Sequence, residues 1–210
     1  MKSARILVGL LVLLPGMSRG RAAVPPEPVP REAGRLVAVK DFNPTLLAGE
    51  IVRETNDVRV RQGLAPFKPE PRLVAAADSQ AAMISLLLRG GHDNPLPHQG
   101  DPLARALHAG LPAGTVAENA ARLNARNRET GRAYTYRELA AVLVQAWMDS
   151  PGHRANLLSP KLQYLGCGTR TALLLPGEEV VYAIQDFYTP TPASEPPPPA
   201  FRPGATSITR

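Results

Sequence analysis

The distribution of proline limits how much of this chain can fold. The sequence has 23 prolines in 210 residues, and they cluster at its two ends, over 25–30 and after Tyr188. Proline fixes φ and removes a backbone donor, so such segments favour extended, solvated conformations. We therefore predict a proline-rich linker over 23–35, one folded domain over 36–189 and a disordered tail over 190–210.

The first 22 residues have the composition of a secretory signal peptide. Lys2 and Arg5 precede a nine-residue apolar run over 6–14, and a small-x-small triplet follows at 18–20. A membrane anchor is the alternative, but the run is far shorter than the ~20 residues that span a bilayer. We predict a signal peptide over 1–22, cleaved after Gly20 or Ala22, and a secreted or periplasmic protein with no transmembrane segment after cleavage.

Charge and cysteine usage exclude several classes of function. Cleavage after Gly20 removes three basic residues and no acids, which lowers the formal charge from +6 to +3. So small a charge, without a basic stripe interleaved with aromatic residues, excludes a nucleic-acid partner. The single cysteine, Cys167, excludes internal disulfides and CxxC-type metal sites. We expect the mature protein to be a monomer.

Capping residues and glycines mark the ends of several helices. Asn43, Asp101 and Ser150 each stand before a proline, and Thr135 forms a capping box with Glu138. Apolar residues then recur at helical spacing, most clearly after the Thr135 cap. These signals predict helices from Pro44 to Gly63, from Leu73 to Arg89, from Pro102 to Gly110, after Thr135 and after Ser150.

The last part of the domain is predicted to form strands. Tyr164–Leu175 and Glu179–Tyr188 are strand-like segments joined through Pro176-Gly177, which indicates a hairpin. The second strand is nearly all apolar over 180–184, which is typical of a strand covered on both faces. Helices followed by a doubly covered hairpin predict an α+β fold, a three-layer α-β-α sandwich with a small, mostly antiparallel sheet.

Four histidines are the first candidates for chemistry. His92 and His98 lie in the loop between the second and third predicted helices. His108 falls in the last turn of the third helix, where an imidazolium complements the helix dipole, so we assign it a structural role. His153 falls in the first turn of a helix, where the dipole disfavours the charged ring. A neutral imidazole at this position could bind a metal or accept a proton.

Other polar residues have ordinary structural interpretations. Glu118-Asn119 follows a loop containing Gly and Pro, and from spacing alone we interpret the dipeptide as a solvated loop pair. Ser150 is better explained as a helix cap than as a nucleophile. Cys167 falls within a predicted buried strand and is expected to be an inert thiol. The sequence contains no HExxH, Walker loop, nucleophile elbow or dinucleotide fingerprint.

Several short segments occur in a specific order along the folded region. NDVR at 56–59 is followed by GLAPF at 63–67, and Gly110 precedes Glu118-Asn119 by eight residues. The most specific segment is WMDSPGHRANLL at 147–158, and LGCG and YxxQDF follow it in the predicted strands. Together, over about residues 50–189, they resemble the bacterial secreted branch of the CAP superfamily, also called SCP-like or cysteine-rich secretory protein-like domains.

The resemblance implies a cleft lined by two histidines and acidic residues, which in some members hold a divalent cation. Glu118 and His153 match two of these positions, and the spacing favours His92 over His98 for the first histidine. Animal members have a glutamate where this chain has Ser150, with Asp149 beside it. The implied cleft residues are His92, Glu118, Asn119, Asp149, Ser150 and His153. Of these, His92, His153 and Glu118 form the implied ligand set for Zn²⁺ or another divalent cation.

The resemblance leaves three functional hypotheses open. Several family members bind sterols or other lipids, so we expect a secreted binding module for a lipid, a small apolar ligand or a cell-envelope component. The alternative is a metal-dependent hydrolase in which Glu118 or Asp149 is the base, since proteolysis has been proposed for some members. The third is that Glu118, Asn119 and His153 only tie loops to the sheet by hydrogen bonds.

Overall fold

The structure is a computed structural model that describes residues 31–175 and 178–191. The predicted signal peptide, most of the predicted linker, the turn at 176–177 and the tail after Thr191 lie outside these residues. No helix in the described ranges is long and apolar enough to cross a membrane. A short 3₁₀ turn at Arg31–Gly34 buries Ala33, so ordered structure begins within the range assigned to the linker.

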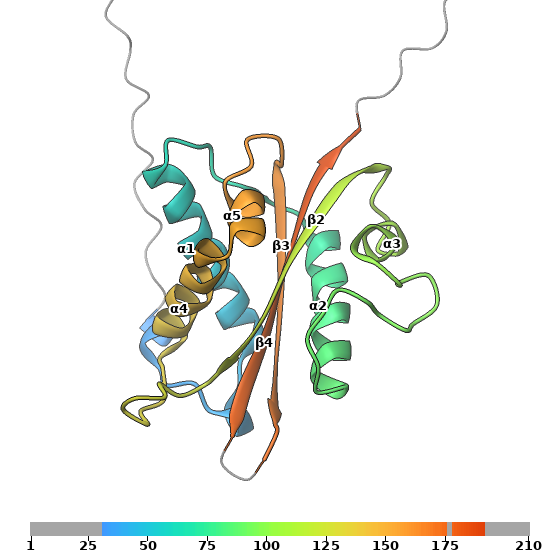
Figure 1. The fold of residues 1–210 in the computed structure, drawn as a ribbon. Coiled ribbons are helices and arrows are strands. Elements are labelled where there is room, and N and C mark those ends of the chain that lie inside the picture. The colour runs from blue at the N-terminus through green and yellow to red at the C-terminus, as the bar shows by residue number, and fades with distance from the viewer. Residues whose placement is uncertain (1–30, 176–177, 192–210) are drawn as a thin grey trace, which may run out of the picture.

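The described residues form five α-helices and a four-stranded sheet (Figure 1). In chain order after a second 3₁₀ turn at Val39–Asp41, the elements are α1 (Pro44–Arg61), β1 (Lys68–Pro69), α2 (Pro71–Leu86), α3 (Pro102–His108), β2 (Gly114–Asn124), α4 (Tyr136–Asp149), α5 (Pro151–Leu157), β3 (Tyr164–Leu173) and β4 (Glu179–Pro190).

The predicted helices are confirmed, and most begin at the predicted caps. Asn43 caps α1, Asp101 caps α3, and Thr135 and Glu138 form both hydrogen bonds of the capping box at α4. Ser150 occupies the cap position of α5, but its side chain makes no capping hydrogen bond. The second helix, α2, begins earlier than expected because Glu70 caps it, and it ends at Leu86.

The sheet contains the predicted hairpin and two strands that the sequence did not predict. Its strand order is β1-β3-β4-β2, in which β4 pairs antiparallel with both neighbours and β1 pairs parallel with β3. The interpretation of Glu118-Asn119 as a solvated loop pair is wrong, because both residues are buried in β2. Pairing with the apolar β4 along its full length makes this segment a strand.

The helices form two layers that enclose the sheet, as the predicted three-layer α-β-α sandwich requires (Figure 1). The larger core lies between one face of the sheet and helices α1 and α4, and it contains Trp147 and Phe187. On the other face, α2 packs on Tyr182 and Ile184, and α3 packs on Tyr188. The central strand β4 is buried from Val180 to Tyr188, which confirms that both of its faces are covered.

Helix α2 lies directly on strand β3 because two glycines allow a close approach. A Cβ atom at Gly166 would lie 2.3 Å from the carbonyl carbon of Leu73, and one at Gly168 would lie 2.4 Å from that of Ala77. Backbone atoms cannot move aside as a flexible side chain can, so no larger residue fits at either position. The two glycines therefore set the distance between this helix and the edge of the sheet.

Candidate functional site

Glu118 and Asn119 point to opposite faces of the edge strand β2. Glu118 pairs across the strands with Asp186 and faces α3, whereas Asn119 pairs with Gln185 and faces α5. Successive residues of a strand alternate in this way. The acid-amide dipeptide therefore joins two polar clusters, one on each side of the sheet, rather than lining one pocket with both side chains.

Glu118 is held by two cationic or polar partners at once. Its Oε1 lies 2.6 Å from Nδ1 of His92, and its Oε2 accepts a hydrogen bond from the Arg105 guanidinium. The side chains of Arg105 and Glu118 are 0% and 1% exposed. Arg105 also donates to the carbonyl oxygens of His92, at 2.9 Å, and Gln99, at 3.2 Å. This arginine connects α3, the loop before it and β2.

Asp186 places a second buried carboxyl beside Glu118. Neither of its side-chain oxygens has a hydrogen-bond partner among the described residues. Burial, followed by the neighbouring Glu118 carboxyl, raises the pKa of Asp186 well above its usual range, while Arg105 opposes this effect. The protonated, neutral form of Asp186 is thereby favoured, so the cluster holds one compensated ion pair and one neutral acid.

The other face of β2 carries a hydrogen-bond network centred on Asn119. Its amide nitrogen donates to the carbonyl oxygen of His153, at 3.2 Å, and to Oε1 of Gln185, at 3.3 Å. Its amide oxygen accepts from Asn156 at 2.9 Å, and Gln185 in turn donates to Thr55 of α1 at 2.8 Å. Asn119 therefore ties α5 to the sheet, and its contact with His153 is to the backbone.

The pKa values of the two imidazoles are shifted in opposite directions. The hydrogen bond to Glu118 raises the pKa of His92, whose side chain is 50% exposed. Burial, followed by the charge of His92, lowers the pKa of His153. The sequence also predicted a neutral His153, but from the helix dipole, whereas burial is the main cause of the lowered pKa in the structure. The charged form of His92 and the neutral form of His153 are thereby favoured.

The remaining candidates from the sequence lie elsewhere. Asp149, at the exposed end of α4, accepts a hydrogen bond from Gln145 at 2.7 Å. Ser150 follows it and makes no side-chain capping bond. His98 is exposed in the loop at a φ of 61°, and the histidine that contacts Glu118 is His92. Cys167 is buried as predicted, and burial raises the pKa of its thiol.

The arrangement does not fit the implied three-residue metal site. Within the described ranges, no group of three or more His, Cys, Asp or Glu side chains is placed to hold a metal ion. Both oxygens of Glu118 are already engaged, which leaves the two imidazoles as donors. Catalytic zinc sites use three protein ligands and structural sites four. Metal binding by His92, His153 and Glu118 stays a prediction from the sequence.

Sequence reasoning missed Arg105 and the role of Asp186. Arg105 lies in a helix of seven residues, too short for periodicity to mark a buried charge. Asp186 gave a usable signal, because it lies two residues after the apolar run, in a strand predicted to be covered on both faces. A charged residue in such a strand must be paired or neutral.

Several hollows lie away from these clusters, and two of them differ in their lining. The first, of about 270 Å³, is an apolar groove between α1 and α2, at the edge of β3 that no described strand covers beyond Leu165. Its lining residues are Pro44, Thr45, Ala48, Gly49, Val52, Val74, Asp78 and Cys167. We call it the α1–α2 groove.

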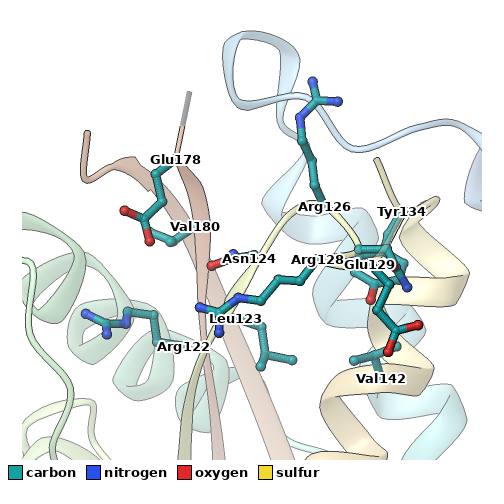
Figure 2. A pocket seen from close by; sticks show the side chains of 11 residues that line it. Arg122, Leu123, Asn124, Arg126, Arg128, Glu129, Tyr134, Val142, Glu178 and Val180 are labelled. Atoms are coloured by element: carbon teal, nitrogen blue, oxygen red, sulfur yellow. Dashed lines mark hydrogen bonds between the residues drawn. The ribbon is translucent and has the colours of Figure 1, made fainter. Parts of the chain in front are cut away.

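The second hollow, of about 420 Å³, lies at the end of β2, and both arginine and glutamate side chains line it (Figure 2). Arg128 extends across it towards Asn124, with Glu178 and Glu129 on opposite sides. Neither hollow includes any of the cleft residues that the sequence implied.

Comparisons with known proteins agree with this architecture. The family model of CAP, the cysteine-rich secretory protein family, matches residues 52–172, more than half of the chain. The uncharacterized protein YkwD of Bacillus subtilis strain 168 is 28% identical over 119 residues, which are 57% of this chain. The match covers 40% of YkwD, so this chain spans less than half of that relative.

Two solved structures have a similar fold. An extracellular protein containing an SCP domain from Bacillus anthracis strain Ames superposes with a TM-score of 0.53 and 21% identity, over 71% of this chain and 42% of that protein. An outer surface protein of Borrelia burgdorferi gives a TM-score of 0.50 and 13% identity, over 75% of this chain and 99% of that protein. At these identities the likeness establishes the fold alone.

Proposed function

The chain belongs to the CAP, or cysteine-rich secretory protein, family, and from that premise we propose that it is an extracellular binding module for a small, mainly apolar ligand. The observation that carries the proposal is the α1–α2 groove, an open hollow lined mainly by apolar side chains. Ligand sites are typically hollows of this kind with a few polar groups that orient the ligand.

The polar groups of the groove are few, and its one charged lining residue is compensated. Asp78 is paired with Arg170 at 2.8 Å, which reduces its attraction for a cation. The hydroxyl of Thr169, close by on β3, donates to the carbonyl oxygen of Pro44 at 2.9 Å. A lipid chain or another apolar group therefore suits the groove better than a cation does.

The hydrolase alternative has less support from the geometry. A general base needs a free carboxylate or imidazole beside the reacting group. Glu118 has both oxygens engaged, and Asp149 is exposed at the end of α4. Burial raises the pKa of the Cys167 thiol, which disfavours the nucleophilic thiolate. A binding function asks none of these groups to react.

The extracellular location in this proposal depends on the predicted signal peptide. The predicted signal peptide at 1–22 supports a secreted or periplasmic protein. The structural neighbour from Bacillus anthracis is an extracellular protein and that from Borrelia burgdorferi is an outer surface protein, which supports the same location.

A displacement assay tests the binding proposal. The mature protein is incubated with a fluorescent fatty acid, which is then displaced by octanoic, dodecanoic or octadecanoic acid. Gly49→Leu is the blocking variant, because Gly49 lines the groove and a Cβ there would meet no atom within 4 Å. Val60→Leu is the matched control, since Val60 is on the same helix, is 60% exposed and lies outside the groove.

The proposal predicts saturable binding to the wild type and to Val60→Leu, and at least tenfold weaker binding to Gly49→Leu. The blocking variant should remain folded, because leucine is a better helix former than glycine. Equal binding by all three proteins, or no binding of any of the acids to the wild type, contradicts the proposal.

A further inference from the structure

A buried guanidinium lies where a cation at Glu118 would have to bind. Arg105 is fully buried, and its guanidinium contacts the Glu118 oxygen that His92 leaves free. We propose that the Arg105 guanidinium occupies the place of a cation at this site and prevents Glu118 from binding divalent metal ions in the native protein. The site implied by the sequence is thereby replaced by an internal ion pair.

The geometry of the guanidinium makes it hard to displace. Besides Glu118, it donates from Nη1 to the carbonyl oxygens of His92 and Gln99. A planar guanidinium can serve several acceptors at once, whereas an ammonium is a point charge on a flexible stem. A metal ion that took Glu118 would leave Arg105 buried with two carbonyl oxygens and no counter-charge.

The electrostatic consequence opposes metal binding twice. Removing one partner of a buried ion pair leaves an uncompensated charge in a medium of low polarity, which is strongly unfavourable. The displaced guanidinium would also remain next to the incoming dication and repel it.

Arg105 is at the same time a positioning residue for His92. It holds the backbone of His92 through the carbonyl oxygen and the ring through Glu118. In metal sites, a ligand histidine is oriented by a carboxylate behind it. Here Arg105 fixes the Glu118 carboxylate behind the ring, so the arginine orients the His92 imidazole without a metal ion.

Zinc titration by calorimetry, with elemental analysis of the dialysed proteins, tests the proposal. The variants are Arg105→Gln, which removes the charge, and Arg105→Lys, which keeps it. Glu118→Gln identifies binding that depends on the carboxylate. The wild type and Arg105→Lys should bind no stoichiometric zinc through Glu118. Arg105→Gln should bind zinc at least tenfold more tightly than the wild type, and Glu118→Gln added to it should abolish the gain.

Two results would overturn the proposal. One is stoichiometric zinc in the wild type that is weakened at least tenfold by Glu118→Gln alone. The other is a folded Arg105→Gln protein, verified by circular dichroism, with no gain in zinc affinity. If Arg105→Gln does not fold, the comparison of zinc binding by the wild type and by Glu118→Gln, the first of these results, still tests the proposal. Neither result depends on the α1–α2 groove, so failure here leaves the binding proposal intact.

Discussion

The two edges of the sheet differ in what their residues are free to do. At the β2 edge, Glu118 and Asn119 are surrounded by partners from α3, α5 and the loop before α3. At the β3 edge, the α1–α2 groove is open and mainly apolar. The residues most suggestive of chemistry are engaged in holding the fold together. The α1–α2 groove, where we propose that a ligand binds, lies at the edge that has almost none of them.

This contrast shows that a cluster of buried polar residues can serve to hold the fold together. Each partner of Glu118 comes from a different segment, so the carboxylate fixes the positions of a loop and a helix relative to β2. A buried polar group without a partner is costly, so these contacts stabilise the fold, although the neighbouring Asp186 oxygens have no partner among the described residues. The β3 edge has no comparable demand, and small residues such as Gly49 leave room there.

The largest expected effect is the loss of the buried arginine at the β2 edge. Arg105→Met should destabilise the protein by about 3–5 kcal/mol, because it leaves Glu118 buried without its counter-charge. Denaturant unfolding measures the loss. Arg128→Met is the control, since Arg128 is exposed in the hollow at the end of β2, and it should change stability by less than about 0.5 kcal/mol. Equal losses in the two variants would contradict a special role for Arg105.

At the β3 edge, a methyl group added at the contact with α2 should lower the stability, whereas one added in the groove should raise it. Gly168→Ala should destabilise by about 1–3 kcal/mol, because the new methyl group meets the backbone of α2 at Ala77. Gly49→Ala should stabilise by about 0.5–1 kcal/mol, because it improves α1 and fills open space. Thermal unfolding compares them. Tolerance of Gly168→Ala would show that the helix is not fixed where the structure places it.

The smallest effect concerns the half-exposed histidine at the β2 edge. The folded state raises the pKa of His92 above 6.5, chiefly through Glu118, with a smaller favourable contribution from Asp93 and opposition from burial and Arg105. A raised pKa gives stability that is complete below pH 6.5 and is lost as the pH rises through the folded value. The stability difference between wild type and His92→Gln should thus be larger at pH 6 than at pH 9.

That difference should be less than about 1 kcal/mol, because solvent screens the exposed ring. Urea unfolding at the two pH values measures it, and His98→Gln, in the exposed part of the same loop, is the control. A difference that grows towards pH 9 would mean that Glu118 does not stabilise the charged ring.

The helices and the hairpin were predictable because their signals are local. A capping box at Thr135 or a proline after Asn43 depends on a few neighbouring residues. Strand β2 was not predictable, since its alanines, asparagines and glutamate have little strand propensity. It becomes a strand because β4 offers a long apolar partner, and such pairing depends on residues far away in the sequence.

The contacts at strand β2 were only partly predictable from the sequence. His92 does contact Glu118, but His153 meets β2 through its backbone and Asn119 on the other face of the sheet, so a shared cleft of these residues stays a prediction. No sequence pattern showed that Arg105 would reach Glu118, because the contact joins a short helix to a strand that was itself not foreseen. The apolar groove is equally a product of packing, since it lies between helices on opposite faces of the sheet.

The most direct test of the account is where a ligand binds. In a ¹H–¹⁵N correlation spectrum of the mature protein titrated with dodecanoic acid, the account predicts saturable shifts for the amides of Ala48, Gly49 and Val74 in the α1–α2 groove. The amides of His92, Glu118 and Asn119 should stay in place. Shifts confined to those three residues, with the groove unchanged, would contradict it.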